Sequence, residues 1–308
     1  MILRFHYRSK RRRGAALLAV LWVVALLIGL VAGASLMIMQ DLDMSGVKRQ
    51  VFRARMLGEA ALAIAMNPDV KPDDPLLRQQ VGPDERFEVE LTGEDGLLNP
   101  NVLLVREDRA TLRRVFLYWG LTPQQSDLLI DSLLDWVDGD DFVRVRGAES
   151  KAYGRNGMPF NRPFRSIEEM AMVRGMQDLE QIYPSWRTWF SVYASGVLDL
   201  NSAQPEMIAA VTGADIRRAQ QVRSMRLGRD GRLNTQDDYE FKTLDEPIAT
   251  LGVANADPAA LVAVLSVQSL TRRILVKVQV GDFQREVAVV ARGTQGQATN
   301  SILWMGER

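Results

Sequence analysis

The most apolar stretch of the chain lies near its N-terminus. Residues 15–40 contain no charged side chain, and the 25 positions from Ala15 to Met39 are almost wholly apolar. At about 1.5 Å per residue, a helix of this length crosses a hydrocarbon core of about 30 Å. The sequence therefore predicts a transmembrane helix, and the Arg and Lys residues before it place its start on the cytosolic side.

The apolar pattern changes to an amphipathic one after residue 40. Apolar positions then recur at spacings near three and four between charged residues, at Val47, Val51, Met56, Leu57, Leu62 and Ile64. This spacing predicts that the helix continues to about Met66, where Asn67-Pro68 ends it. One helix over residues 15–66 would be about 75 Å long.

The C-terminal part of the chain alternates with the period of a β-strand. Apolar residues occupy every second position from Ile274 to Val280, Gly281-Asp282 follows, and residues 283–290 return. This pattern predicts a β-hairpin over residues 274–292 with a two-residue turn. Residues 86–91 also alternate, and residues 301–304 are a fourth candidate strand that would close the sheet.

The residues between the candidate strand at 86–91 and the hairpin are predicted to be mainly helical. Gly, Pro and Asp residues separate five candidate helices, at residues 110–119, 123–137, 166–174, 204–211 and 215–225. Thr122-Pro123 is typical of a helix start, and the spacing of Ser166 and Glu169 predicts a capping box. The predicted fold is α+β, a long N-terminal helix packed on an antiparallel sheet that a large helical insertion interrupts.

The composition excludes several kinds of chemistry. The 308 residues include no Cys, and the one His is His6 in the basic N-terminal segment. This excludes Cys-His and Ser-His-Asp hydrolases, zinc sites of the usual ligand types and disulfides from the rest of the chain. No carboxylate pair, Ser-Lys dyad or phosphate loop stands out, so we expect no enzyme. A bound metal would be a hard cation held by oxygen ligands.

The balanced charge of the chain conceals an asymmetry. Six basic residues and no acidic one precede Ala15, at Arg4, Arg8, Lys10, Arg11, Arg12 and Arg13. Removing these six from the 38 basic residues leaves 32 against 38 acidic ones, a formal charge of −6. An acidic body is poorly suited to binding nucleic acid phosphates.

Two acidic segments are candidate cation sites. Asp138, Asp140 and Glu149 crowd around Gly139, and such carboxylates repel one another unless water or a cation screens them. A solvated acidic turn explains the same residues. Residues 230–237 resemble the second half of an EF-hand-like loop, which adds Asp237 and Asp238 as candidates, although a plain turn capped by Asp also fits.

Residues 198–223 resemble a helix-hairpin-helix, a motif that binds DNA phosphates through backbone amides. Thr212-Gly213-Ala214-Asp215 replaces the usual Gly-x-Gly of that motif, and Asp215 would face the phosphate. A membrane-tethered periplasmic DNA-binding protein is therefore the alternative function.

The N-terminal segment resembles the leader of type IV pilin-like proteins. A short basic leader, residues 1–14, ends in Gly14, and a small apolar start begins at Ala15. The resemblance implies cleavage after Gly14 by prepilin peptidase and N-methylation of Ala15. Mature position five is Glu in most such proteins, but here it is Ala19, and an ionisable group in lipid is costly without a partner. The alternative is a secretory signal cut at residues 32–34.

Three internal segments resemble the K family of type II secretion minor pseudopilins: LLDWVDGDDFVRVRGAESKAY (133–153), NRPFRSIEEMAMVRGM (161–176) and LDLNSAQPEMIAAVTG (198–213). The resemblance implies a subunit at the tip of the periplasmic pseudopilus that initiates assembly, supports export of folded proteins and binds calcium. It implies minor pseudopilins of the I and J classes and the inner-membrane secretion platform as partners.

The predicted organisation follows from these patterns and the resemblance. It is a leader (1–14), a transmembrane half-helix (15–40), a pilin-like helix with the first strands (41–98), an inserted SAM-like or helix-hairpin-helix-like α-domain (99–264) and C-terminal pilin-like strands (265–308). We expect a single-pass inner-membrane protein with a cytoplasmic N-terminus and a periplasmic body.

Overall fold

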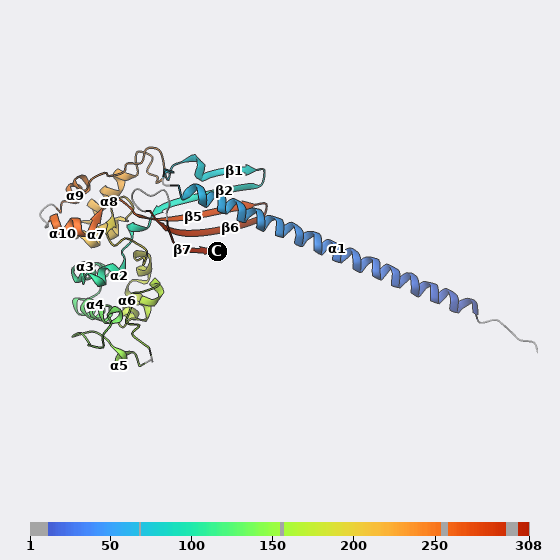
Figure 1. Cartoon of the computed structure of the whole chain (residues 1–308), viewed down its shortest axis with the longest axis horizontal. Helices are drawn as coiled ribbons and strands as arrows, with labels where there is room; N and C mark the ends of the chain where they lie inside the picture. The colour runs from blue at the N-terminus through green and yellow to red at the C-terminus, as the bar shows by residue number, and fades with distance from the viewer. Residues whose placement is uncertain (1–11, 68, 155–156, 254–257, 294–300, 308) are drawn as a thin grey trace, which may run out of the picture.

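A single long helix projects from the body of the molecule (Figure 1). The computed structural model describes residues 12–307 except 68, 155–156, 254–257 and 294–300. Helix α1 runs from Arg12 to Ala65, which confirms the long helix that the sequence predicts. Its segment Ala16–Ser35 has a mean hydropathy of 2.8, the one helix of the described residues that is apolar and long enough to cross a membrane.

In the described part of the chain, five antiparallel strands form the sheet beneath the C-terminal half of α1. Their order is β1 (Arg78–Gly82), β2 (Glu85–Gly93), β5 (Thr271–Val280), β6 (Phe283–Arg292) and β7 (Ser301–Glu307). The predicted hairpin is thus β5 and β6, with Gly281 at a φ of 59° in its turn. The predicted strands at residues 86–91 and 301–304 lie within β2 and β7.

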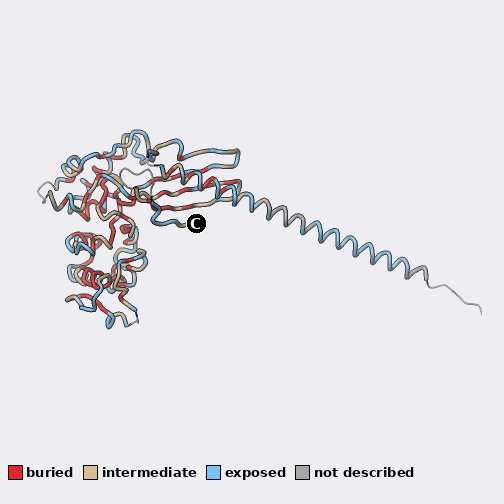
Figure 2. The backbone as a smooth tube through the Cα atoms, viewed as in Figure 1, coloured by how far each residue is buried: buried red, intermediate tan, exposed pale blue. Residues whose placement is uncertain are grey.

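Helix α1 packs on one face of the sheet through small side chains. Ala54, Ala61 and Ala65 are fully buried and belong to one core with Val276 and Val289 of the strands. Alanine lets the helix backbone approach the sheet closely, so that branched strand residues fill the space between them. N-terminal to this contact, α1 leaves the sheet, and the side chains of residues 16–35 are exposed (Figure 2).

The chain between β2 and β5 is mainly helical. Its helices are α2 (Pro100–Val105), α3 (Arg109–Tyr118), α4 (Pro123–Val137), α5 (Ser150–Tyr153), α6 (Met176–Ile182), α7 (Pro205–Thr212), α8 (Ile216–Arg226), α9 (Asp245–Leu251) and α10 (Pro258–Val264). They surround a second apolar core that contains Phe116, Trp136 and Trp186. The described part of this segment also holds a short parallel pair, β3 (Leu198–Asp199) and β4 (Leu265–Ser266).

One of the predicted helices is wrong. Residues 166–174 contain a 3₁₀ segment, η3 (Ile167–Met172), and the Ser166 side chain makes no capping hydrogen bond. The carboxylate of Glu169 instead accepts hydrogen bonds from the Arg162 side chain and from the backbone N–H of Arg165. Competition from these donors explains why the capping box does not form. A complete capping box begins α4, between Thr122 and Gln125.

A cluster of hydrogen bonds joins the helical segment to the sheet. The buried Asp95 lies in the 3₁₀ segment η2 (Glu94–Gly96), directly after β2. Its carboxylate accepts from the backbone N–H groups of Ser195 at 2.6 Å, Leu270 at 2.7 Å and Thr271 at 3.1 Å. Three stretches of chain that are distant in sequence therefore meet at one carboxylate.

Candidate functional sites

The predicted acidic segment follows the C-terminus of α4. Asp138 is the C-cap of α4, and Asp135, in its last turn, is fully buried. The guanidinium of Arg144 contacts both carboxylates. It donates to Asp135 Oδ1 at 2.8 Å and forms an ion pair with Asp138. Asp140 Oδ1 accepts from the N–H of Phe142 at 2.9 Å. The loop thus gathers more carboxylates than the single guanidinium of Arg144 neutralises.

Glu149 is the most unusual of the predicted site residues. Its side chain is buried, and no group of the described residues donates a hydrogen bond to either carboxylate oxygen. Burial, followed by the nearby charges of Asp135 and Asp138, raises the pKa of Glu149 from 4.5 to about 7. Burial also raises the pKa of Asp138, against the pairing with Arg144, and Asp138 Oδ1 likewise has no described donor. Buried carboxylate oxygens without donors are costly unless a cation or a proton satisfies them.

The structure brings Asp138, Asp140 and Glu149 into one loop without a finished coordination sphere. In the described part of the chain, no group of three or more acidic or His side chains is placed to hold a metal ion. The sequence interpretation also missed Asp135, whose charge acts on Glu149. The four-residue spacing of Asp131 and Asp135 within the mainly apolar residues 128–137 was the signal that could have identified it.

The second predicted cation site has a different environment. Asp237 Oδ2 accepts from the backbone N–H groups of Arg229 and Asp230, which holds the pKa of Asp237 below its usual range. Asp238 Oδ2 accepts from the N–H of Asn234 at 2.6 Å. These oxygens already have donors, as expected of a turn capped by Asp. A second ion at Asp237 and Asp238 stays a prediction.

The helix-hairpin-helix-like segment consists of α7 and α8 around Gly213, which has a φ of 73°. Asp215 caps α8, and its Oδ1 accepts from the N–H of Arg217 at 2.8 Å. A carboxylate therefore occupies the helix N-terminus at which a DNA phosphate would bind. This arrangement does not favour the DNA-binding alternative.

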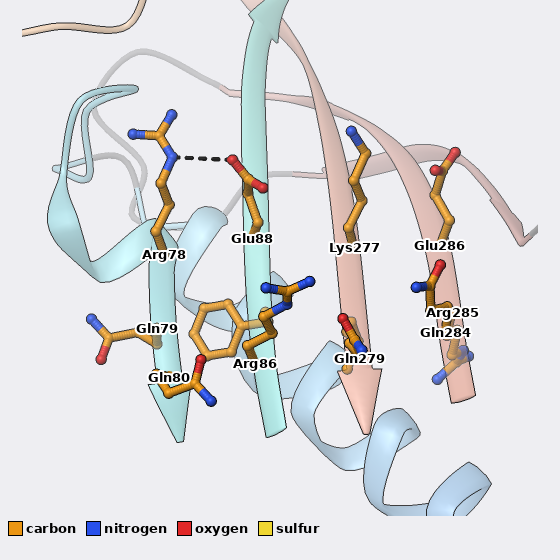
Figure 3. A pocket seen from close by; sticks show the side chains of 12 residues that line it. Arg78, Gln79, Gln80, Arg86, Glu88, Lys277, Gln279, Gln284, Arg285 and Glu286 are labelled. Carbon is orange, nitrogen blue, oxygen red and sulfur yellow. Dashed lines mark hydrogen bonds and ion pairs between the residues drawn. The ribbon is translucent and has the colours of Figure 1, made fainter. Parts of the chain in front are cut away.

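The open face of the sheet carries a shallow pocket with a balanced charge pattern (Figure 3). Residues paired across β1, β2, β5 and β6 alternate in sign: Arg78, Glu88, Lys277 and Glu286. Arg78 Nε lies 3.3 Å from Glu88 Oε1, at the dashed line in the figure. Opposite charges across neighbouring strands stabilise a solvated sheet face. We assign no reaction to this pocket.

The positions that the leader resemblance identifies lie at the start of α1. Gly14, Ala15 and Ala19 are helical, and the Ala19 side chain is exposed within the apolar segment. Residues 1–11 of the predicted leader lie outside the described residues. Cleavage after Gly14, methylation of Ala15 and the assembly role of Ala19 stay predictions. Further along α1, large apolar side chains are exposed beyond the apolar segment, at Met44, Val47, Val51, Phe52 and Met56.

Residues 96–194 match the family described as type II secretion system protein K. This part of the chain is thus similar to protein K. The match contains the motif segments 133–153 and 161–176, and it confirms the resemblance to protein K that these motifs indicated. It also contains the acidic loop with Glu149.

A solved structure shows the same fold over most of the chain. A chain of the GspK-GspI-GspJ complex from the type 2 secretion system of enterotoxigenic Escherichia coli aligns with a TM-score of 0.61 and 17% identity. The alignment covers 87% of this chain and 99% of that chain. No curated protein matches this sequence at a significant level.

Proposed function

We propose that this chain is a minor pseudopilin at the tip of the type II secretion pseudopilus, where it starts assembly and supports export of folded proteins. The observation that carries the proposal is the match to protein K in a chain with a long N-terminal helix. The first part of this helix is apolar, and its C-terminal part packs on an antiparallel sheet. In this proposal, residues 15–40 span the inner membrane, the N-terminus is cytoplasmic and the body is periplasmic.

The shape of the molecule supports a terminal position. The helical segment lies at the end of the sheet opposite the free end of α1 (Figure 1). Another subunit stacked beyond this end would collide with the helices. Ala19 fits the same position, because a subunit with no neighbour ahead would leave a carboxylate in lipid without a partner.

The exposed apolar side chains of α1 supply the surface for partners. Phe52 is 66% and Val47 is 55% exposed, on the stretch between the apolar segment and the sheet contact. Apolar helix faces of this kind associate with the helices of similar subunits. The structural relative was solved as the GspK-GspI-GspJ complex, and we propose pseudopilins of the I and J classes as the partners here. Prepilin peptidase and the inner-membrane platform would act before assembly.

We expect the full chain, extracted from membranes in detergent, to copurify with pilin-like subunits that have shorter bodies. Phe52→Asp should lower the recovery of these subunits at least about tenfold, because it places a charge in an apolar helix contact. Val105→Asp, at a 76% exposed position of α2, is the matched control and should leave recovery unchanged. Equal recovery with both variants, or recovery of nucleic acid without pilin-like subunits, would contradict the proposal.

We also propose that the loop after α4 binds one calcium ion through Asp138, Asp140 and Glu149, together with backbone carbonyls. The donor-free oxygens of Glu149 and Asp138 support it, since they are hard oxygen ligands held away from solvent. A divalent cation would supply positive charge to carboxylates that otherwise repel one another. The role of the ion would be to hold the loop, and Asp135 and Arg144 would position it.

A further inference from the structure

The loop between α4 and α5 exposes three large apolar side chains within four positions. Phe142 is 82%, Val143 is 60% and Val145 is 97% exposed. Single exposed apolar residues are common on protein surfaces, whereas several exposed apolar residues in one loop are a candidate interaction site. This loop lies in the part of the helical segment that is farthest from the sheet (Figure 1).

Carboxylates of α4 hold the backbone of this loop. The N–H of Arg144 donates to Asp135 Oδ2 at 3.2 Å, and the N–H of Arg146 donates to Asp131 Oδ2 at 3.1 Å. Asp131 and Asp135 are four residues apart and therefore share one face of α4. Two alternate residues of the loop are thus tied to the helix, whereas the side chains of Val143 and Val145 remain outside.

At Gly147 the loop backbone lies so close to α4 that a residue with a Cβ atom would not fit. A Cβ added at Gly147 would lie 1.8 Å from Asp135 Oδ2. The Arg146 side chain adds a further bond, from Nη1 to Asp127 Oδ2 at 2.9 Å. Burying the Asp135 carboxylate is costly, and its hydrogen bonds to the loop offset that cost. The result is a preorganised loop that presents its apolar residues to the outside.

We propose that residues 141–145 form a docking loop that inserts Phe142, Val143 and Val145 into an apolar pocket of a partner protein with a basic rim. The charge beside the apolar residues defines the rim. Asp141 is exposed directly before Phe142, whereas the charge of Arg146, directly after Val145, is paired with Asp127. The Asp141 carboxylate disfavours a bilayer rich in anionic lipid, which attracts basic rather than acidic neighbours. A preorganised loop loses little conformational entropy when it binds. The surface is separate from the α1 contact described above.

A photoactivatable benzoylphenylalanine at position 145 of the full chain, expressed in cells of its source, tests this proposal. We expect it to crosslink to one other protein, at an apolar site with Lys or Arg residues around it. Asp141→Lys should reduce the crosslink about fivefold, the effect of losing a charge pair worth about 1 kcal/mol. The same probe at Val105, another highly exposed valine, is the control and should not crosslink to that protein.

Three outcomes would overturn the docking loop. These are equal crosslinks from positions 145 and 105, a crosslink only to a second copy of this chain, and a crosslink yield that Asp141→Lys leaves unchanged or increases. A crosslink from position 145 to lipid and to no protein would replace the protein partner by a lipid surface. Copurification with pilin-like subunits is measured in a separate experiment. It therefore distinguishes a failure of the docking-loop proposal from a failure of the proposed function.

Discussion

Cells that carry Gly14→Val in place of the native residue are expected to accumulate the unprocessed precursor and to lose secretion. The leader resemblance places the cut after Gly14, and a branched side chain there would obstruct a peptidase that accepts glycine. Without cleavage, the amine of Ala15 stays in a peptide bond and the basic residues before it remain attached. An immunoblot for the size of the chain, together with an assay of an exported protein, measures both effects.

Ala34→Leu is the matched variant, because it alters the small-x-small site of the alternative secretory signal. We expect it to leave processing and secretion unchanged, since residues 16–35 remain an apolar helix. Normal processing of the Gly14 variant, combined with loss of processing in the Ala34 variant, would assign the cut to a signal peptidase and contradict the pilin-like leader.

Glu149→Gln is expected to change thermal stability in opposite directions with and without calcium. In chelator, the variant should melt at a higher temperature than the native chain, because it removes a buried charge beside Asp135 and Asp138. With calcium at about 100 times the dissociation constant, the native chain gains about 2.7 kcal/mol, or about 5–10 °C in Tm, and the variant should lose most of this gain. Thermal scans of the detergent-purified full chain measure both values.

The pH dependence of stability gives a second measure of the same carboxylate. The folded-state pKa of Glu149 is about 7, above its ordinary value of 4.5. Protonation of this carboxyl group therefore stabilises the ion-free fold, and the stabilisation is complete below pH 4.5. That contribution is lost as the pH rises to about 7. The Tm of the native chain in chelator should therefore fall over this range, whereas Glu149→Gln should lack this part of the fall. Glu206→Gln, at an exposed residue of α7, is the control.

The chelator experiment also has a contradicting outcome. If chelator lowers the Tm of Glu149→Gln and of Glu206→Gln equally, calcium does not bind through Glu149.

The long helix, the hairpin and α4 could be predicted because their patterns are local and regular. Helix α4 spans Pro123–Val137, the predicted bounds, since Thr122 caps it and its apolar positions repeat with the helical period. Strand β1 was missed because Arg78-Gln79-Gln80 has no apolar alternation. It is an edge strand that, among the described residues, pairs only with β2, so burial does not impose a pattern on it.

The environment of the acidic loop could be predicted only in part. Crowded carboxylates at Asp138, Asp140 and Glu149 are visible in the sequence, but their burial is not. Arg144 binds Asp135 across nine positions, which no helical or strand period specifies. The hydrogen bonds to Asp95 are even harder to predict from the sequence, because the donor at Leu270 is 175 residues away. Both depend on tertiary packing that residue patterns do not encode.

Mass spectrometry of the N-terminus of the mature protein, purified from membranes, tests the central claim most directly. The pilin-like account predicts a chain that begins at Ala15 with one methyl group on its amine. A chain that retains Met1, or one that begins near Ser35, would contradict it.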